Sequence, residues 1–86
     1  MHTVELLSEC LTVAQRLGYK VRQEWLGGIG GGACDFGGHR WIFVDLGLNA
    51  NEQLEQAASA LREDPELNRV ELSPPLSRIL ELRRAA

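Results

Sequence analysis

Two adjacent glycines, Gly37 and Gly38, constrain the fold of this chain more than any other feature of its sequence. They separate two segments of strand-forming composition, Gly32 to Phe36 and His39 to Leu46. A type I′ turn needs positive φ at both central residues, and a Gly-Gly pair meets that need without strain. We therefore predict a two-residue β-hairpin, in which Phe36 lies opposite His39 and Cys34 lies opposite Trp41.

This register assigns the hairpin side chains to two faces of a sheet, because directly opposed residues share a face. One face is mainly aliphatic and has a charged pair near the turn: Ala33, Asp35, Arg40, Ile42, Val44 and Leu46. The other face is mainly aromatic: Cys34, Phe36, His39, Trp41, Phe43 and Asp45. Exposed contiguous apolar area usually marks an interaction site in a soluble protein. We expect a third helix, a second copy of the chain or a ligand to cover the aromatic face.

Hydrophobic spacing and turn residues predict the remaining elements. Apolar residues at helical spacing predict a first helix over Val4 to Leu17, with Thr3 as its N-cap and Gly18 as its stop. Alternation over Tyr19 to Trp25 predicts a strand, followed by a loop over Gly27 to Gly31.

Two further helices are expected after the hairpin. Asn49 and Glu52 have the spacing of a capping box, and Asp64-Pro65 ends the apolar stripe that follows it. Ser73-Pro74-Pro75 is suited to the start of a third helix. The order α-β-β-β-α-α predicts an α+β fold, with a three-stranded antiparallel meander and the helices packed on one face. A chain of 86 residues is expected to form a single domain, residues 1–86.

Charge and composition exclude several classes of partner. The net charge is −3 and the basic residues are scattered, whereas nucleic-acid binding usually needs a clustered basic surface. No apolar run approaches the roughly 18 residues of a membrane span, and acidic Glu5 and Glu9 argue against a signal peptide. We expect a cytoplasmic protein that binds neither nucleic acid nor membrane, in which Cys10 and Cys34 stay reduced.

The glycine-rich stretch before the hairpin raises the possibility of phosphate binding. Residues 28–33 formally match G-x-G-x-x-A, but too few residues remain before Gly37 for the helix that such a site requires. A looser anion-binding nest of backbone N–H groups would use Gly28, Gly30, Gly31 and Gly32. The simpler interpretation is that these glycines allow a sharp turn or a close backbone approach.

A few polar residues are weak catalytic candidates. Cys34 would be the nucleophile, His39 its base, and Asp45 or Glu24 the group that orients the base. The simpler interpretation is that Cys34 packs as a small hydrophobe and that His39 packs on Phe36 at the hairpin edge. Asp45 is unusual because it lies in an apolar strand, where it needs a partner such as Arg22 or a backbone N–H.

Metal binding would draw on two cysteines and two histidines, Cys10, Cys34, His2 and His39, with Glu24 or Asp45 as oxygen donors. The paired spacings of structural zinc sites are absent from the sequence, so we expect neither a metal nor a cofactor.

The sequence favours a small interaction module over an enzyme. We expect a homodimer, or a complex with another protein, formed through the aromatic residues Phe36, Trp41 and Phe43. The alternative is a small-molecule or anion-binding protein, or a minimal enzyme, that uses the glycine loop with Cys34, His39, Glu24 and Asp45.

Overall fold

The computed structural model describes residues 3–28 and 30–85, and its elements follow the expected order. They are α1 (Thr3–Arg16), β1 (Lys20–Glu24), β2 (Gly32–Phe36), β3 (His39–Asp45), α2 (Ala50–Arg62), the 3-10 helix η1 (Pro65–Arg69) and α3 (Pro74–Ala85). The α+β class is confirmed. The sequence does not predict η1, which begins where Asp64-Pro65 ends the second helix.

The predicted hairpin is confirmed in turn and in register. β2 and β3 are antiparallel, with Phe36 opposite His39 and Cys34 opposite Trp41. Gly37 and Gly38 have φ of 62° and 79°, the positive values that a two-residue turn of this kind requires. The two faces of the hairpin therefore carry the residues assigned to them from the sequence.

The expected antiparallel meander is wrong. The strand order is β1-β3-β2, and β1 pairs with β3 in parallel, from Lys20 opposite Trp41 to Glu24 opposite Asp45. A meander would place β2 at the centre of the sheet, although most of its side chains are exposed. β3 is apolar on both faces and so suits the central position, where a strand pairs along both edges. The loop from β1 to β2 crosses the carboxyl end of β3 to make this order possible.

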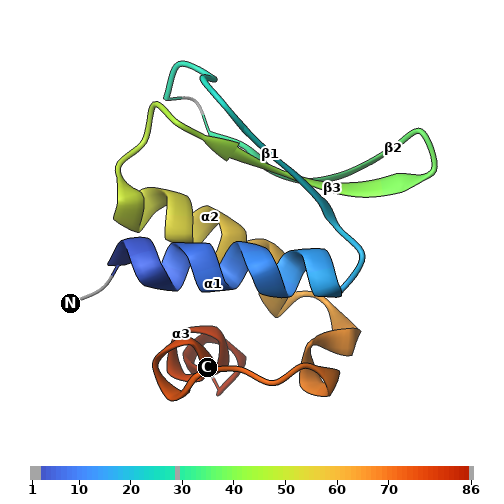
Figure 1. The fold of residues 1–86 in the computed structure, drawn as a ribbon, viewed down its shortest axis with the longest axis vertical. Helices are drawn as coiled ribbons and strands as arrows, with labels where there is room; N and C mark the ends of the chain where they lie inside the picture. The colour runs from blue at the N-terminus through green and yellow to red at the C-terminus, as the bar shows by residue number, and fades with distance from the viewer. Residues whose placement is uncertain (1–2, 29, 86) are drawn as a thin grey trace.

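The structure has three layers (Figure 1). The sheet forms the first layer, α1 and α2 form the second, and α3 lies beyond these helices, on their side away from the sheet. Ile42 and Val44 of β3 are fully buried against the helices. Leu76 and Leu80 of α3 are fully buried in the same hydrophobic core.

Local hydrogen bonds end α1 and begin α2 as the sequence predicts, whereas Thr3, the expected N-cap of the first helix, is instead the first residue of α1. After α1, the Gly18 N–H donates to the Gln15 carbonyl and the Tyr19 N–H to the Ala14 carbonyl, the paired bonds of a Schellman motif. The capping box of α2 is confirmed by reciprocal bonds between Asn49 and Glu52, of 3.0 and 2.8 Å. These caps fix the ends of the two helices that support the sheet.

Because α3 packs on the far side of the helical layer, it does not cover the aromatic face of the sheet. The sequence predicts that a third helix, a second copy of the chain or a ligand covers this face. The expectation for the third helix is wrong, and the second copy and the ligand stay predictions. No helix in the described ranges is both long and apolar enough to cross a membrane.

Candidate functional site

The sheet turns one face to the helices and leaves the other open (Figure 1). Val21, Ile42 and Val44 lie on the helix side. Strand alternation and the pairing registers place the following residues on the opposite side, which we call the open sheet face: Lys20, Arg22, Glu24, Cys34, Phe36, His39, Trp41 and Phe43. All three residues predicted as the interaction surface, Phe36, Trp41 and Phe43, belong to it.

Trp41 and Phe43 form the centre of the open sheet face. Their rings stack with centroids 5.7 Å apart and an angle of 16° between the planes. The Lys20 ammonium lies 6.0 Å from the Trp41 ring centroid, and the Trp41 indole N–H donates to the Phe36 carbonyl at 3.3 Å. These contacts hold both rings in place, so a partner that docks there meets an already ordered surface.

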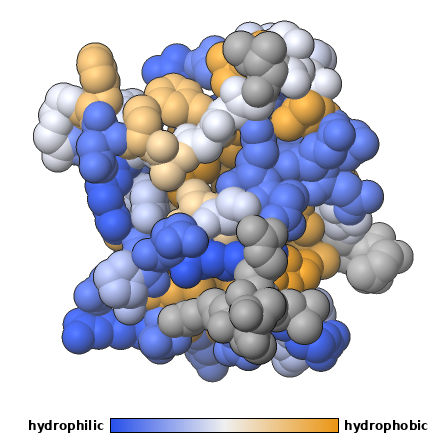
Figure 2. Space-filling view, turned by 180° about the vertical axis from the view of Figure 1, so that it is seen from behind, coloured by the Kyte–Doolittle hydropathy of each residue, from blue (hydrophilic) through white to orange (hydrophobic). Residues whose placement is uncertain are grey.

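Phe36 extends this apolar area to the end of the hairpin, where its side chain is 73% exposed. Cys34 on the same strand is exposed as well, whereas Trp41 and Phe43 are half-buried. In the space-filling view, pale orange surface gathers over the sheet half of the molecule, bordered by blue hydrophilic surface (Figure 2). Exposed aromatic rings grouped on one sheet face are the pattern of an interaction surface.

Asp45 ends β3 and holds the glycine loop in place. One carboxylate oxygen, Oδ1, accepts hydrogen bonds from the amides of Leu26 at 3.0 Å and Gly47 at 2.8 Å. The other, Oδ2, accepts from the Gly30 amide at 2.9 Å. Strand alternation points Asp45 toward the open sheet face, but its side chain is fully buried because the loop closes over it.

The environment of Asp45 favours its charged form. Burial by itself raises the pKa of this carboxyl, and four backbone amides, those of Gly30, Gly47, Leu26 and Gly28, act in the opposite direction. The amides prevail, and the pKa of Asp45 lies below its ordinary value of 3.8. The Asp45 carboxylate is therefore the anion that the loop amides bind. An acidic residue in an apolar strand needs a partner, and for Asp45 that partner is the backbone.

The ligand-binding role of the glycine loop stays a prediction. Of the four candidate glycines, Gly28 and Gly30 already direct their amides to Asp45. Gly31 serves a close approach: a Cβ built there would lie 2.0 Å from the Phe43 carbonyl oxygen, so any side chain at this position would force the backbone to shift. Gly32 begins β2 and pairs with Phe43.

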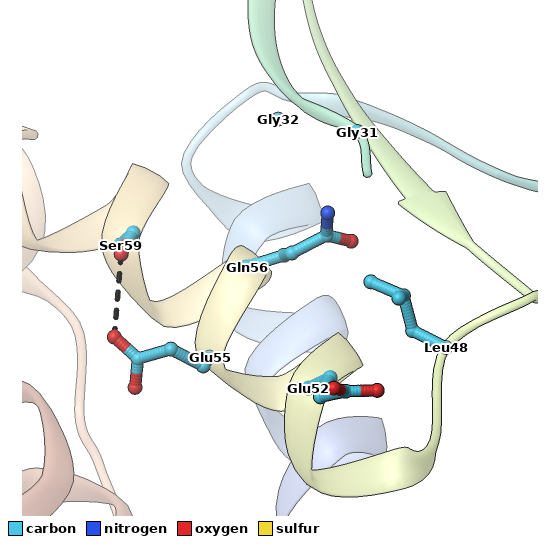
Figure 3. Close-up of a pocket in the computed structure, with 7 residues that line it drawn as sticks. All are labelled: Gly31, Gly32, Leu48, Glu52, Glu55, Gln56 and Ser59. Carbon is cyan, nitrogen blue, oxygen red and sulfur yellow. Dashed lines mark hydrogen bonds between the residues drawn. The ribbon is translucent and has the colours of Figure 1, made fainter. Parts of the chain in front are cut away.

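Gln56 of α2 connects the helical layer to the same region. Its side-chain oxygen accepts from the Asp45 amide at 3.3 Å. Figure 3 shows Gln56 pointing from α2 toward Gly31, beside the side chain of Leu48. These residues line a hollow of about 390 Å³ between α2 and the start of β2, together with Gly32, Glu52, Glu55 and Ser59.

The two carboxylates of this hollow are engaged within the protein. Glu52 belongs to the capping box of α2, and Glu55 forms an ion pair with Arg62 at 2.7 Å. Ser59 donates to Glu55 at 3.4 Å, the dashed line of Figure 3. The polar groups of the hollow thus stabilise α2, and we assign it no ligand.

The four catalytic candidates do not converge on one point. Cys34 lies opposite Trp41, whereas His39 lies at the turn opposite Phe36, and no hydrogen bond joins the two side chains within residues 3–28 and 30–85. Glu24 forms an ion pair with Arg22, and Asp45 is committed to the loop amides. A catalytic role for these residues stays a prediction that no contact supports.

Among the described residues, no group of three or more histidines, cysteines and carboxylates is placed to hold a metal ion. Cys10 is fully buried in the core, where burial raises the pKa of its thiol to about 12. His2, another candidate ligand, lies outside the described residues.

A second polar cluster ties the hairpin to the helical layer. Arg40 stacks on the Tyr19 ring at 4.2 Å, donates to the Leu17 carbonyl at 2.9 Å and forms an ion pair with Asp64 at 3.1 Å. The buried Asp64 accepts a hydrogen bond from the Glu66 amide at 2.7 Å. Burial by itself raises the pKa of Asp64, but the Glu66 amide, Tyr19 and Arg40 together lower it below its ordinary value.

Sequence reasoning misses Gln56 and the Tyr19–Arg40–Asp64 cluster, whose members are far apart in the chain. Of the residues in these two polar regions, only Asp45 is signalled by the sequence, because it is an acidic residue in an otherwise apolar strand. No protein family, curated protein or solved structure matches this chain.

Proposed function

We propose that this chain is a small protein-interaction module that associates, in the first place with a second copy of itself, through the open sheet face. One observation carries the proposal: the stacked rings of Trp41 and Phe43 and the exposed ring of Phe36 lie on a sheet face that none of the described helices covers. A cytoplasmic location, in which the association is non-covalent, belongs to the same proposal.

The residues of the open sheet face favour protein docking over catalysis. Aromatic rings bury a large area at a small cost in side-chain entropy, and they are enriched at the centres of interfaces. The charged side chains lie along β1, at one border of the rings, and Arg22 and Glu24 neutralise each other. An apolar centre with a polar border is the usual arrangement of a protein–protein interface.

Sedimentation equilibrium over a wide concentration range tests the proposal. We expect the wild-type chain to form dimers, and Trp41→Ala to raise the dissociation constant at least about tenfold, as for a ring at the centre of an interface. Val4→Ala is the control, because it removes exposed apolar surface from α1 instead. A strict monomer at high micromolar concentration, or equal effects of both variants, would refute the proposal.

A further inference from the structure

β2 is an edge strand with little of the usual protection against pairing. Its outer edge faces away from β3, and the side chains from Ala33 to Phe36 are exposed. Edge strands are normally guarded by charged side chains, above all lysine, by proline or by a bulge. β2 has neither lysine nor proline, pairs with β3 without a bulge, and carries Asp35 as its one charged side chain. The opposite edge, β1, carries Lys20, Arg22 and Glu24. The two edges therefore differ, and β2 is the one open to pairing.

We propose that β2 pairs with β2 of a second copy, antiparallel about a two-fold axis through Cys34, so that the two sheets become one sheet of six strands. Cys34 is the middle residue of Gly32–Phe36, so this axis gives the longest possible overlap of the two strands. The inference rests on the self-association proposed above, and it specifies how the second copy is placed.

The backbone of β2 suits this axis. Phe36 and His39 close the two-residue turn as a hydrogen-bonded pair, and such pairs alternate along an antiparallel ladder. The backbone N–H and C=O groups of Cys34 therefore form hydrogen bonds with β3. Those of Ala33 and Asp35 point outward, away from β3. An axis through Cys34 places Ala33 opposite Asp35 of the second copy. The outward groups of both strands are then satisfied together.

The side chains fit the same register. Gly32, Cys34 and Phe36 share the open sheet face, and the axis places Phe36 of one copy opposite Gly32 of the other. A Cβ at Gly32 would meet nothing within 4 Å, so this position offers space beside Phe43, its partner on β3. The exposed Phe36 ring fills that space, the arrangement in which a cross-strand aromatic residue covers a strand glycine. Because Phe43 stacks on Trp41, the incoming ring also covers part of the open sheet face.

Neighbouring axes fit less well. An axis through Asp35 would place two carboxylates directly opposite each other, which is unfavourable. An axis through Ala33 would place Phe36 opposite Gly30, beyond the end of the strand. Only the axis through Cys34 brings each exposed Phe36 ring to Gly32.

The size of the open sheet face also favours joining two sheets. Three strands of five to seven residues span about 14 Å by about 20 Å at ordinary strand spacings, well below the roughly 800 Å² per partner of a stable interface. Pairing along β2 adds a row of backbone hydrogen bonds and brings the Phe36 ring of each copy toward the stacked Phe43 and Trp41 rings of the other. The two copies thus gain more contact than the open sheet face alone provides.

Disulfide trapping tests this placement. A non-hydrogen-bonded antiparallel pair brings the two Cα atoms to about 4.5 Å, within disulfide range, so Cys34 of two copies should cross-link when copper–phenanthroline is added to the full chain. The matched control moves the thiol by one residue, in Ala33→Cys combined with Cys34→Ser. We expect the wild-type chain to cross-link at least about tenfold faster than this control, through Cys34 by peptide mass spectrometry.

A mixture of two variants provides a second test, in which cross-linking is expected between different positions. Ala33→Cys and Asp35→Cys chains, each with Cys34→Ser, should cross-link to each other faster than either does alone. Amide hydrogen exchange of the wild-type chain reads the same contact without any variant: the N–H groups of Ala33 and Asp35 should become protected as concentration rises.

The outcomes separate the inference from the proposed function. Dimers in sedimentation with equal cross-linking rates for the wild-type chain and the Ala33→Cys control, and with no new protection at Ala33 and Asp35, would overturn the β2 pairing and leave self-association standing. A chain that stays monomeric and cross-links without positional preference would overturn both. Preferential Cys34 cross-linking with protected Ala33 and Asp35 supports the pairing.

Discussion

The carboxylate of Asp45 accepts a hydrogen bond from the backbone N–H of Gly30 at 2.9 Å, and through this contact the end of β3 holds the loop that crosses it. The loop must cross because β1 and β2 lie on opposite sides of β3. The amides of Leu26 and Gly30 are partly buried and need an acceptor, and Asp45 provides one at the crossing point. The glycine-rich stretch and the lone acidic residue of β3 are therefore two halves of one structural device.

Asp45→Asn tests this device through stability. The amide side chain loses the charge that the four loop amides stabilise, so we expect the melting temperature at neutral pH to fall by on the order of 10 °C. Thermal unfolding followed by circular dichroism measures the change. Asp35→Asn, at an exposed position of the same sheet, should leave the melting temperature within about 2 °C of wild type.

The carboxylate of Asp45 also makes the stability of the folded protein depend on pH. The pKa of both Asp45 and Asp64 is lowered in the folded protein, so the unfolded chain takes up protons at a higher pH than the folded one. The stabilisation is fully present above about pH 4 and is lost as pH falls through the lowered values. We expect a flat melting temperature from about pH 7 to about pH 5 and a decline below about pH 4. The melting temperature of Asp45→Asn should decline less below about pH 4 than that of the wild-type chain. An equal decline would contradict the lowered pKa of Asp45.

Gly31→Ala tests the close approach of the loop to β3. The new Cβ would meet the Phe43 carbonyl oxygen at 2.0 Å, so the backbone must shift, at a cost of about 2 to 4 kcal/mol of unfolding free energy. Urea denaturation measures it. The comparison is Gly27→Asn, where a Cβ meets nothing within 4 Å and asparagine tolerates positive φ. This control should cost less than about 1 kcal/mol, and equal costs would argue against the clash.

The two cysteines should differ sharply in reactivity. Burial in the core raises the pKa of the Cys10 thiol to about 12, whereas Cys34 is exposed on β2. Iodoacetamide at about pH 8 should label Cys34 in the native protein at least about a hundredfold faster than Cys10, because reaction at Cys10 requires unfolding. Mass spectrometry of partly labelled protein reads the ratio. Comparable labelling would mean that α1 does not pack as described.

The sequence is most informative where local chemistry decides the structure. The turn at Gly37-Gly38 determines the hairpin register, and the capping box of Asn49 and Glu52 needs only residues close in the chain. The assignment of Trp41 and Phe43 to one face, opposite Ile42 and Val44, follows from that register. These features can be predicted because each depends on a few neighbouring residues.

The parallel partner of β3 cannot be predicted in the same way. Sequence neighbours usually pair, and that rule favours β2 as the central strand. The decisive facts are long-range: β3 is apolar on both faces, and the buried carboxylate of Asp45 fastens a crossing loop. Arg40 likewise finds its ion-pair partner in Asp64, which lies far along the chain beyond α2. Contacts of this kind depend on the assembled fold.

Quenching of Trp41 fluorescence by acrylamide tests most directly whether the open sheet face is an association surface. Trp25→Phe leaves Trp41 as the single indole, and the quenching constant is then measured from low to high micromolar protein. We expect it to fall by at least about a third as dimers form, because the ring becomes covered. A constant that stays unchanged while sedimentation shows association would mean that the chain associates elsewhere, and an unchanged constant with a monomer throughout would mean that the face stays bare.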